Sequence, residues 1–306
     1  MPEHTAMMSA DVIDSMLDLM RRLPPTRTEE NVAALVGICP EDADELLQSV
    51  DQPLKVMVDR ATGREYLACD YNRDGESYRS PWSNEYDPPL DDGAVPSSRM
   101  RKLEIQANEA FDTYREMYYE GGVSSVYLWD PEEPSGGGNF AGVVVLKKAM
   151  TPATPYEPSG SWDSIHVFET MERGRQAHYK LTSTVMLHLL TRKGSESDGK
   201  PSTDRKGPES WKRDGELSLS GSMTRQTEQD WPLLETSSHI GNIGKMIEEM
   251  EIKMRNLLQE ASQRALSVYF GKTRDIVYDL RSVDDLEKAR RQKELQKELV
   301  GFIKRP

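Results

Sequence analysis

The chain has little cysteine and no long hydrophobic run. Its 306 residues include two cysteines, Cys39 and Cys69, so a disulfide framework does not hold the fold together. No apolar stretch approaches the ~20 residues that a membrane-spanning helix needs, and the N-terminus carries no secretory hydrophobic region. From these absences we expect a protein of the reducing cytoplasm without a transmembrane segment.

Motifs of common catalytic sites are also missing. There is no G-x-S-x-G, C-x-x-C or H-E-x-x-H, and Gly271-Lys272-Thr273 lacks the upstream glycine of a phosphate-binding loop. The five histidines are scattered without companion ligands at metal spacing, which favours structural or solvent-facing roles. We therefore expect no metal, no cofactor and no enzyme, a small-molecule enzyme being the least favoured interpretation.

Positive charge is scarce overall and concentrated at one end. The chain has 39 Lys and Arg against 52 Asp and Glu, a net charge of -13, so neither nucleic acid nor an acidic membrane surface is expected as a bulk partner. Residues 287–306 carry seven basic and three acidic side chains, a local charge of +4 that leaves -17 for the remainder. An anionic partner is therefore expected to meet this local patch.

An acidic loop looks like a calcium site but lacks a closing ligand. Four residues fit the first six positions of the EF-hand pattern: Asp70, Asn72, Asp74 and Gly75. The twelfth position is Pro81, where a glutamate must close the coordination shell. We expect a turn instead, with positive φ at the Asp-Gly step and a hairpin that pairs residues 66–69 with 77–79. The prolines that follow predict an extended segment.

Helical spacing of apolar residues predicts helices at the N-terminus and in the middle of the chain. Prolines divide residues 1–55 into three short helices, which short loops should hold as an antiparallel bundle. Thr26 and Glu29 form a capping-box pair for the second helix, and Pro40 suits the start of the third. A further helix is expected from Ser98 to Glu120, ending at a Gly-Gly pair.

The period then becomes strand-like. Five segments rich in β-branched and aromatic residues are separated by glycine or polar turns: 123–129, 140–148, 162–171, 176–192 and 216–227. Because no helix intervenes, they predict an antiparallel meander. Residues 195–215 are polar and poor in aliphatics, so we expect a disordered insertion, and an inert loop is favoured over a partner-binding one.

A long helix is expected over residues 234–270, where apolar residues alternate steps of three and four. Its narrow seam begins with Ile240, Ile243, Ile247, Met250 and Met254. Two interpretations stay equally open: the helix packs on its own sheet, or it also crosses a partner subunit.

The C-terminal segment, 271–306, ends in a basic amphipathic helix. Leu295, Leu299, Phe302 and Ile303 fall on one helical face, among basic residues that include Lys293 and Lys297. With nothing after it to cover that face, the helix is predicted either to bind a partner or to fold back as a brace, and the residues alone do not decide between the two.

Taken together, several strings resemble the beta-subunit family of F-actin-capping proteins, over nearly the whole chain. The strings are Cys69-Asp-Tyr-Asn-Arg-Asp-Gly75, Tyr78-Arg-Ser-Pro-Trp-Ser-Asn84, Tyr86-Asp-Pro-Pro-Leu90, residues 120–130, 162–166, 178–186 and 269–277. The resemblance implies an α+β fold with a helical stalk (1–55), a β-hairpin and extended segment (56–97), a helix plus antiparallel sheet (98–233), a long capping helix (234–270) and an actin-binding tail (271–306).

The same resemblance implies function and partners. It identifies a subunit of a pseudo-symmetric heterodimer in which an alpha subunit shares the sheet and crosses the long helix through the seam that starts at Ile240. The dimer would bind the barbed end of actin filaments without calcium and block subunit addition and loss. The tail from Lys293 to Ile303 would insert its apolar face into actin, and phosphoinositides and capping regulators are further expected ligands.

Two further expectations accompany this assignment. One alternative is a structural or adaptor subunit of the same heterodimer without end-capping activity, because Gly301 and the early Pro306 weaken and shorten the last turn of the tail. The other concerns assembly: a meander of about five strands leaves open edges, so the chain should aggregate when it is expressed without its partner.

Overall fold

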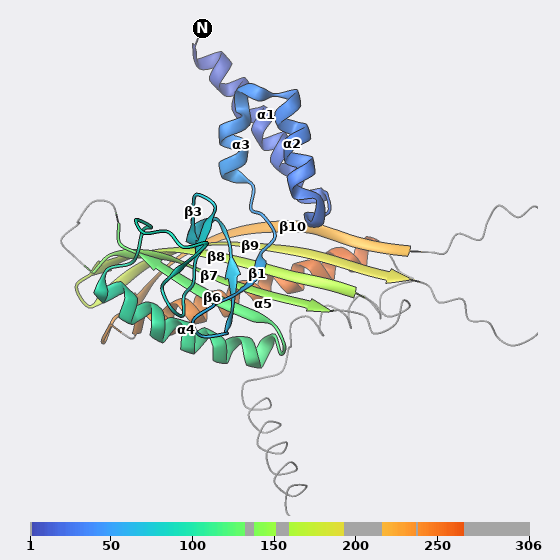
Figure 1. The fold of residues 1–306 in the computed structure, drawn as a ribbon. Helices are drawn as coiled ribbons and strands as arrows, with labels where there is room; N and C mark the ends of the chain where they lie inside the picture. The colour runs from blue at the N-terminus through green and yellow to red at the C-terminus, as the bar shows by residue number, and fades with distance from the viewer. Residues whose placement is uncertain (1, 132–137, 151–158, 193–215, 237, 266–306) are drawn as a thin grey trace, which may run out of the picture.

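The structure is a computed structural model that describes residues 2–131, 138–150, 159–192, 216–236 and 238–265, with side chains described for residues 12–131, 138–150, 159–190, 220–236 and 238–257. It is an α+β fold in which an N-terminal helical bundle stands on one face of a five-stranded sheet and two long helices lie on the other side (Figure 1). None of the described helices is long and apolar enough to cross a membrane.

The N-terminal bundle contains three α-helices, as the prolines predict. They are α1 (Pro2–Arg22), α2 (Thr28–Ile38) and α3 (Ala43–Ser49), around a small core of Met16, Met20, Val32 and Leu46. The predicted capping box is wrong: residues 25–27 form a 3₁₀ turn, so α2 begins at Thr28, whose hydroxyl donates to the carbonyl of Pro25 at 2.8 Å. Pro24 and Pro25 favour a 3₁₀ turn before the helix, so α2 starts two residues after Thr26, the predicted cap.

Two small hairpin sheets follow, and their pairing differs from the prediction. The strands are β1 (Lys55–Val58), β2 (Glu65–Ala68), β3 (Arg73–Asp74), β4 (Ser77–Arg79) and β5 (Tyr86–Asp87). Residues 66–68 pair with β1, not with 77–79, and β4 pairs with β3 and β5. Gly75 has φ of 57°, as the Asp-Gly turn requires, but a 3₁₀ turn at Asp70–Asn72 separates it from β2.

The main sheet is the predicted antiparallel meander. Its order is β10-β9-β8-β7-β6, built from β6 (Val123–Trp129), β7 (Phe140–Met150), β8 (Ser159–Arg173), β9 (Gln176–Arg192) and β10 (Glu216–Pro232). Every neighbouring pair is antiparallel. The last strand continues five residues past its predicted end because it stays paired with β9 down to Gln176. The predicted insertion at 195–215 lies outside the described residues.

Side chains of the sheet alternate between two apolar layers. The larger layer joins the sheet to α4 (Ser98–Tyr118) and α5 (Ser238–Ala265), and the smaller one lies under β1 and β2 on the opposite face. Gly142 of β7 belongs to the tightly packed part, since a Cβ there would lie 2.5 Å from Leu128 and 2.6 Å from Phe168. Both faces are therefore covered, which fixes the sheet as the platform for the site.

Candidate functional site

The seam of α5 faces its own sheet. Ile243, Ile247, Met250 and Met254 are at most 5% exposed, and all four belong to the apolar layer between helix and sheet, against which the half-buried Ile240 also packs. The interpretation that the helix packs on its own sheet is therefore confirmed. Contact of these residues with a partner subunit stays a prediction. Ile252 and Leu257 lie on the other side of the helix, 37% and 39% exposed.

A buried carboxylate fixes the middle of α5. Glu251 is fully buried and accepts hydrogen bonds from the hydroxyls of Tyr114 (2.5 Å), Tyr119 (2.7 Å) and Ser164 (2.9 Å). Nε2 of His166 lies 3.1 Å from the same carboxylate, and its Nδ1 lies 2.8 Å from the hydroxyl of Ser183. Glu251 is thereby tied directly to α4, to the chain just after it and to β8, and through His166 to β9, which sets the position of α5 along the sheet.

A second polar contact holds the N-terminal end of α5. His239 is fully buried, with Nδ1 2.8 Å from the hydroxyl of Tyr179 and Nε2 3.2 Å from Glu172. Burial lowers the pKa of His239, although Glu172 opposes that shift. The neutral imidazole can then donate to one neighbour and accept from the other, so the histidine acts structurally, as the sequence predicted.

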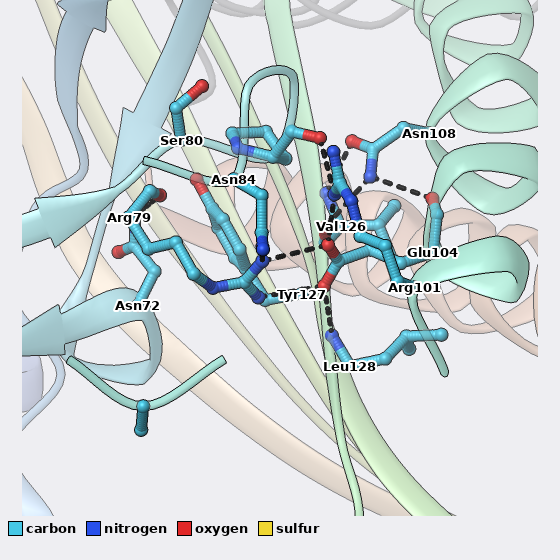
Figure 2. Close-up of polar contacts among 12 residues, drawn as sticks. Asn72, Arg79, Ser80, Asn84, Arg101, Glu104, Asn108, Val126, Tyr127 and Leu128 are labelled. Carbon is cyan, nitrogen blue, oxygen red and sulfur yellow. Dashed lines mark hydrogen bonds and ion pairs between the residues drawn. The ribbon is translucent and has the colours of Figure 1, made fainter. Parts of the chain in front are cut away.

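At the β6 end of the sheet, side chains of α4 bind the outer edge of the strand (Figure 2). The amide of Asn108 makes two bonds to one residue: its oxygen accepts from the N–H of Val126, and its nitrogen donates to the carbonyl of Val126, both at 2.9 Å. One helical turn earlier, Glu104 accepts from the N–H of Leu128 at 2.9 Å. These backbone groups point away from β7 and would otherwise be open to another strand.

The carboxylate of Glu104 is itself clamped by two arginines. Arg79 of β4 donates to both of its oxygens, at 2.9 and 2.8 Å, and Arg101 donates to one of them at 2.5 Å. Glu104 is fully buried and Arg79 is 4% exposed. Burial alone would lower the pKa of Arg79, but its pairing with Glu104 outweighs burial and raises it. This is a buried ion pair with two-point geometry.

The extended, proline-rich segment supplies the outer support of this pair. The side chain of Asn84 accepts from Arg79 at 2.7 Å, and the carbonyls of Pro81 and Trp82 each accept from Arg101 at 2.8 Å. Asn72 donates to the carbonyl of Arg79 at 2.8 Å and accepts from the N–H of Cys69 at 2.9 Å. The irregular string at residues 69–84 thus folds around one buried charge pair.

Two residues of the loop that resembles an EF-hand, Asn72 and Asp74, make hydrogen bonds within the same region. Both polar atoms of the Asn72 side chain are used as just described, and Asp74 accepts from the N–H of Ala94 at 3.4 Å. The described residues bring one other potential set of ligands together, Cys39, Glu41 and Asp42. Glu41 is exposed whereas Asp42 is 9% exposed, and acidic groups of this kind are common in proteins without any ion.

The opposite edge of the sheet is formed by the outer side of β10. Strand β10 pairs with β9 over its whole length of 17 residues, and no other described strand pairs with its outer side. The bundle touches this strand from one face, since a Cβ on Gly221 would lie 2.8 Å from the carbonyl oxygen of Arg21. The sheet therefore has one edge closed by α4 and one long edge without a described strand partner (Figure 1).

Of the predicted binding residues, those of the tail lie outside the described part of the chain: Lys293, Leu295, Lys297, Leu299, Phe302 and Ile303. Sequence reasoning missed Glu104 and Glu251, because carboxylates on helices were interpreted as solvated, and it assigned no role to the amide of Asn108. A usable signal was present: Glu251 interrupts the apolar seam four residues after Ile247, and Glu104 and Asn108 lie four apart beside Leu103 and Ala107.

The family match and the sequence relatives agree with the resemblance seen in the sequence. Residues 13–277 match the family described as F-actin capping protein, beta subunit. An F-actin-capping protein subunit beta from Aspergillus oryzae is 53% identical over 292 residues, 95% of this chain and 98% of that protein. The subunit beta from Caenorhabditis elegans is 49% identical over 292 residues, 95% and 97% of the two chains. A homodimeric actin capping protein alpha subunit from Plasmodium berghei, a solved structure, gives a TM-score of 0.45 at 13% identity, covering 85% of this chain and 94% of that one.

Proposed function

This chain belongs to the family of F-actin capping protein beta subunits, and we propose that it pairs with an alpha subunit to cap the barbed ends of actin filaments. The observation that carries the proposal is the match along 95% of the chain at 53% identity to a protein of that description. The dimer blocks addition and loss of actin subunits at the end it covers. It is a binding protein of the cytoplasmic actin cytoskeleton, not an enzyme.

The open edge of β10 supports a shared sheet. A strand of 17 residues whose outer side pairs with no strand of the described part of the chain is unusual in a stable monomer, because unpaired N–H and C=O groups invite another strand. We place the alpha subunit there, since α4 occupies the other edge. In this arrangement the seam from Ile240 to Met254 holds α5 on its own sheet, and the exposed Ile252 and Leu257 contact the partner.

The tail helix predicted from the sequence supplies the second contact with actin. Its apolar face is Leu295, Leu299, Phe302 and Ile303, with Lys293 and Lys297 beside it. Burying a leucine side chain contributes roughly 1.5–3 kcal/mol, so two leucines account for a large part of a tight contact. The body of the dimer and the tail then form two linked contacts with actin. Once one contact is made, the effective concentration of the other is high, so the overall affinity exceeds that of either contact alone. The basic residues of the tail also suit phosphoinositide headgroups and acidic regulators.

A seeded pyrene-actin elongation assay tests the proposal. The chain is co-expressed with its alpha partner and compared with a version ending at Asp285. We expect inhibition of barbed-end growth at sub-stoichiometric dimer, the same in EGTA and in calcium, and weakened by the truncation. A folded dimer that leaves growth unchanged would contradict capping and favour the adaptor subunit.

Adjacent tail residues give a matched pair of variants. Leu299→Arg places a charge on the apolar face, whereas Val300→Arg makes the same kind of change off that face. Since each 1.4 kcal/mol is a factor of ten, we expect Leu299→Arg to weaken capping by about tenfold or more and Val300→Arg to have a much smaller effect. Equal effects of the two variants, or loss of the dimer, would contradict the anchor.

A further inference from the structure

The spacing along α4 matches the spacing along the outer edge of β6. Asn108 meets Val126, and Glu104, four residues earlier, meets Leu128, two residues later. Four helix residues rise about 6.0 Å and two strand residues about 6.6–6.8 Å, so the helix and strand can run antiparallel and stay in step. Side chains of the helix thus take the positions at which the backbone of a sixth strand would bind.

The amide of Asn108 copies a peptide group. Within an antiparallel pair, a residue of one strand gives its N–H to, and takes an N–H from, the residue opposite. Asn108 does both with Val126, each at 2.9 Å. It is 2% exposed, so water does not compete for these bonds. A strand approaching β6 would first have to displace it.

Displacing the side chain of Glu104 from the edge of β6 is unfavourable. Its carboxylate accepts from Arg79, Arg101 and the N–H of Leu128, and none of these groups is more than partly exposed. Swinging Glu104 away would leave Arg79 buried without its counter-charge, which costs several kcal/mol. The faces of β6 are covered too: the N–H of Leu67 donates to Ser125, and the hydroxyl of Tyr127 donates to the carbonyl of Leu67.

We propose that Asn108 and Glu104, with Arg79 holding Glu104, act as a surrogate edge strand that stops sheet growth at β6, so that assembly ends at one partner joined to β10. This inference rests on the proposed heterodimer for its second half, whereas closure of β6 is a property of this chain. Two open edges per subunit would let dimers join end to end into open-ended chains; one open edge allows a closed pair.

Amide hydrogen exchange on the unmodified complex with the alpha subunit is the first test. We expect the amides of Val126 and Leu128 to exchange as slowly as their β6 neighbours Ser125 and Tyr127, whose backbone faces β7. If the amides of Val126 and Leu128 exchange at the rate of an open edge, the surrogate strand does not exist. This measurement needs no variant and is unaffected by a failure to fold.

Two edge variants and one control variant then test the consequence for assembly. Asn108→Leu removes both bonds to Val126, and Gln106→Leu makes a matched change on the exposed side of α4. The double change R79M/E104M opens the edge and removes both members of the most deeply buried pair, while Arg101, whose side chain is 17% exposed, keeps its bonds to the carbonyls of Pro81 and Trp82. We expect Asn108→Leu to speed exchange at Val126 and R79M/E104M to speed exchange at Leu128, each at least tenfold, because each variant removes the acceptor of that amide. Both variants should form multiples of the dimer mass as concentration rises in light scattering. Gln106→Leu should stay 1:1.

The outcomes separate this inference from the proposed function. If either edge variant folds, exchanges faster at the amide whose acceptor it removes (Val126 for Asn108→Leu, Leu128 for R79M/E104M) and still keeps the 1:1 mass at every concentration, then closure of β6 does not limit assembly and the inference is overturned. If the unmodified chain forms no complex with the alpha subunit, the proposed function fails, whereas the exchange rates at β6 still report whether the edge is closed.

Discussion

Asp59 shows how a single carboxylate can join two segments of this chain. It is 3% exposed at the turn between β1 and β2. It accepts from the N–H groups of Ala61 (2.7 Å) and Thr62 (3.1 Å) within the turn, and from the hydroxyl of Ser80 and the N–H of Ser83 (3.0 Å) in the following segment. These bonds favour the ionised form, because each donor points a positive hydrogen at the carboxylate.

The pH dependence of stability follows from that charge. Burial would raise the pKa of Asp59, but the bonds from Ser80, Ser83, Thr62 and Ala61 outweigh it and lower the pKa well below its ordinary value. A lowered folded-state pKa contributes stability above the unfolded pKa of about 3.9 and loses it as pH falls through the folded value. We expect Asp59→Asn to cost about 1–3 kcal/mol at pH 7, a gap that narrows below about pH 4.

Urea unfolding of the co-expressed dimer across pH measures this gap. Asp91→Asn removes an exposed carboxylate and is the control, for which we expect little change at any pH. A gap for Asp59→Asn that stayed constant down to pH 2 would show that its charge does not stabilise the fold.

At the scale of elements, periodicity was enough to predict the sheet and the long helices. β6 and β9 were predicted at their observed limits because alternation and flanking glycines define them locally. The predicted pairing of residues 66–69 with 77–79 was wrong, because residues 66–68 pair with β1. These residues carry the same local signal whether they pair back to β1 or forward to β4. Choosing between the two needs the tertiary contacts of Asp59 and Arg79, which a local pattern does not contain.

The buried polar anchors could not be predicted in the same way. Glu251 and Glu104 lie on helices whose exposed faces carry many other carboxylates, and what distinguishes them is a set of donors distant in the chain, from Tyr114 to Glu251 or from Arg79 to Glu104. The tail residues were predicted from sequence and remain a prediction.

Glu251 gives the test of how α5 is positioned. Replacing it with Ala leaves the hydroxyls of Tyr119 and Ser164 and the ring of His166 without their buried acceptor, at about 1–3 kcal/mol for each unsatisfied group. We expect Glu251→Ala to lower the unfolding free energy of the dimer by more than about 3 kcal/mol and to weaken capping with it.

Lys253→Ala is the matched control, because it shortens an exposed side chain on the same helix. Thermal unfolding followed by circular dichroism compares the two variants. A loss below about 1 kcal/mol for Glu251→Ala would mean that the apolar seam alone positions the helix.

For the whole molecule, the two edges of the sheet predict how the chain behaves without its partner. Without its partner the chain exposes the β10 edge together with the apolar side chains of Ile252 and Leu257, so the chain alone should aggregate and co-expression with alpha should rescue it. In the dimer, hydrogen exchange along β10 should be slow at every amide. A soluble, monodisperse monomer, or alternate β10 amides that still exchange fast in the dimer, would contradict this assembly.

The order of residues along the chain gives the closed edge a further consequence during synthesis. Arg79, Glu104 and Asn108 all precede Val126 and Leu128, so the groups that close β6 leave the ribosome before the strand itself. The edge of β6 can therefore be closed as soon as the strand emerges, while the rest of the sheet is still being translated. The β10 edge, in contrast, can be paired only by a separate polypeptide. The chain is therefore most prone to aggregation between its release from the ribosome and its binding to the alpha subunit.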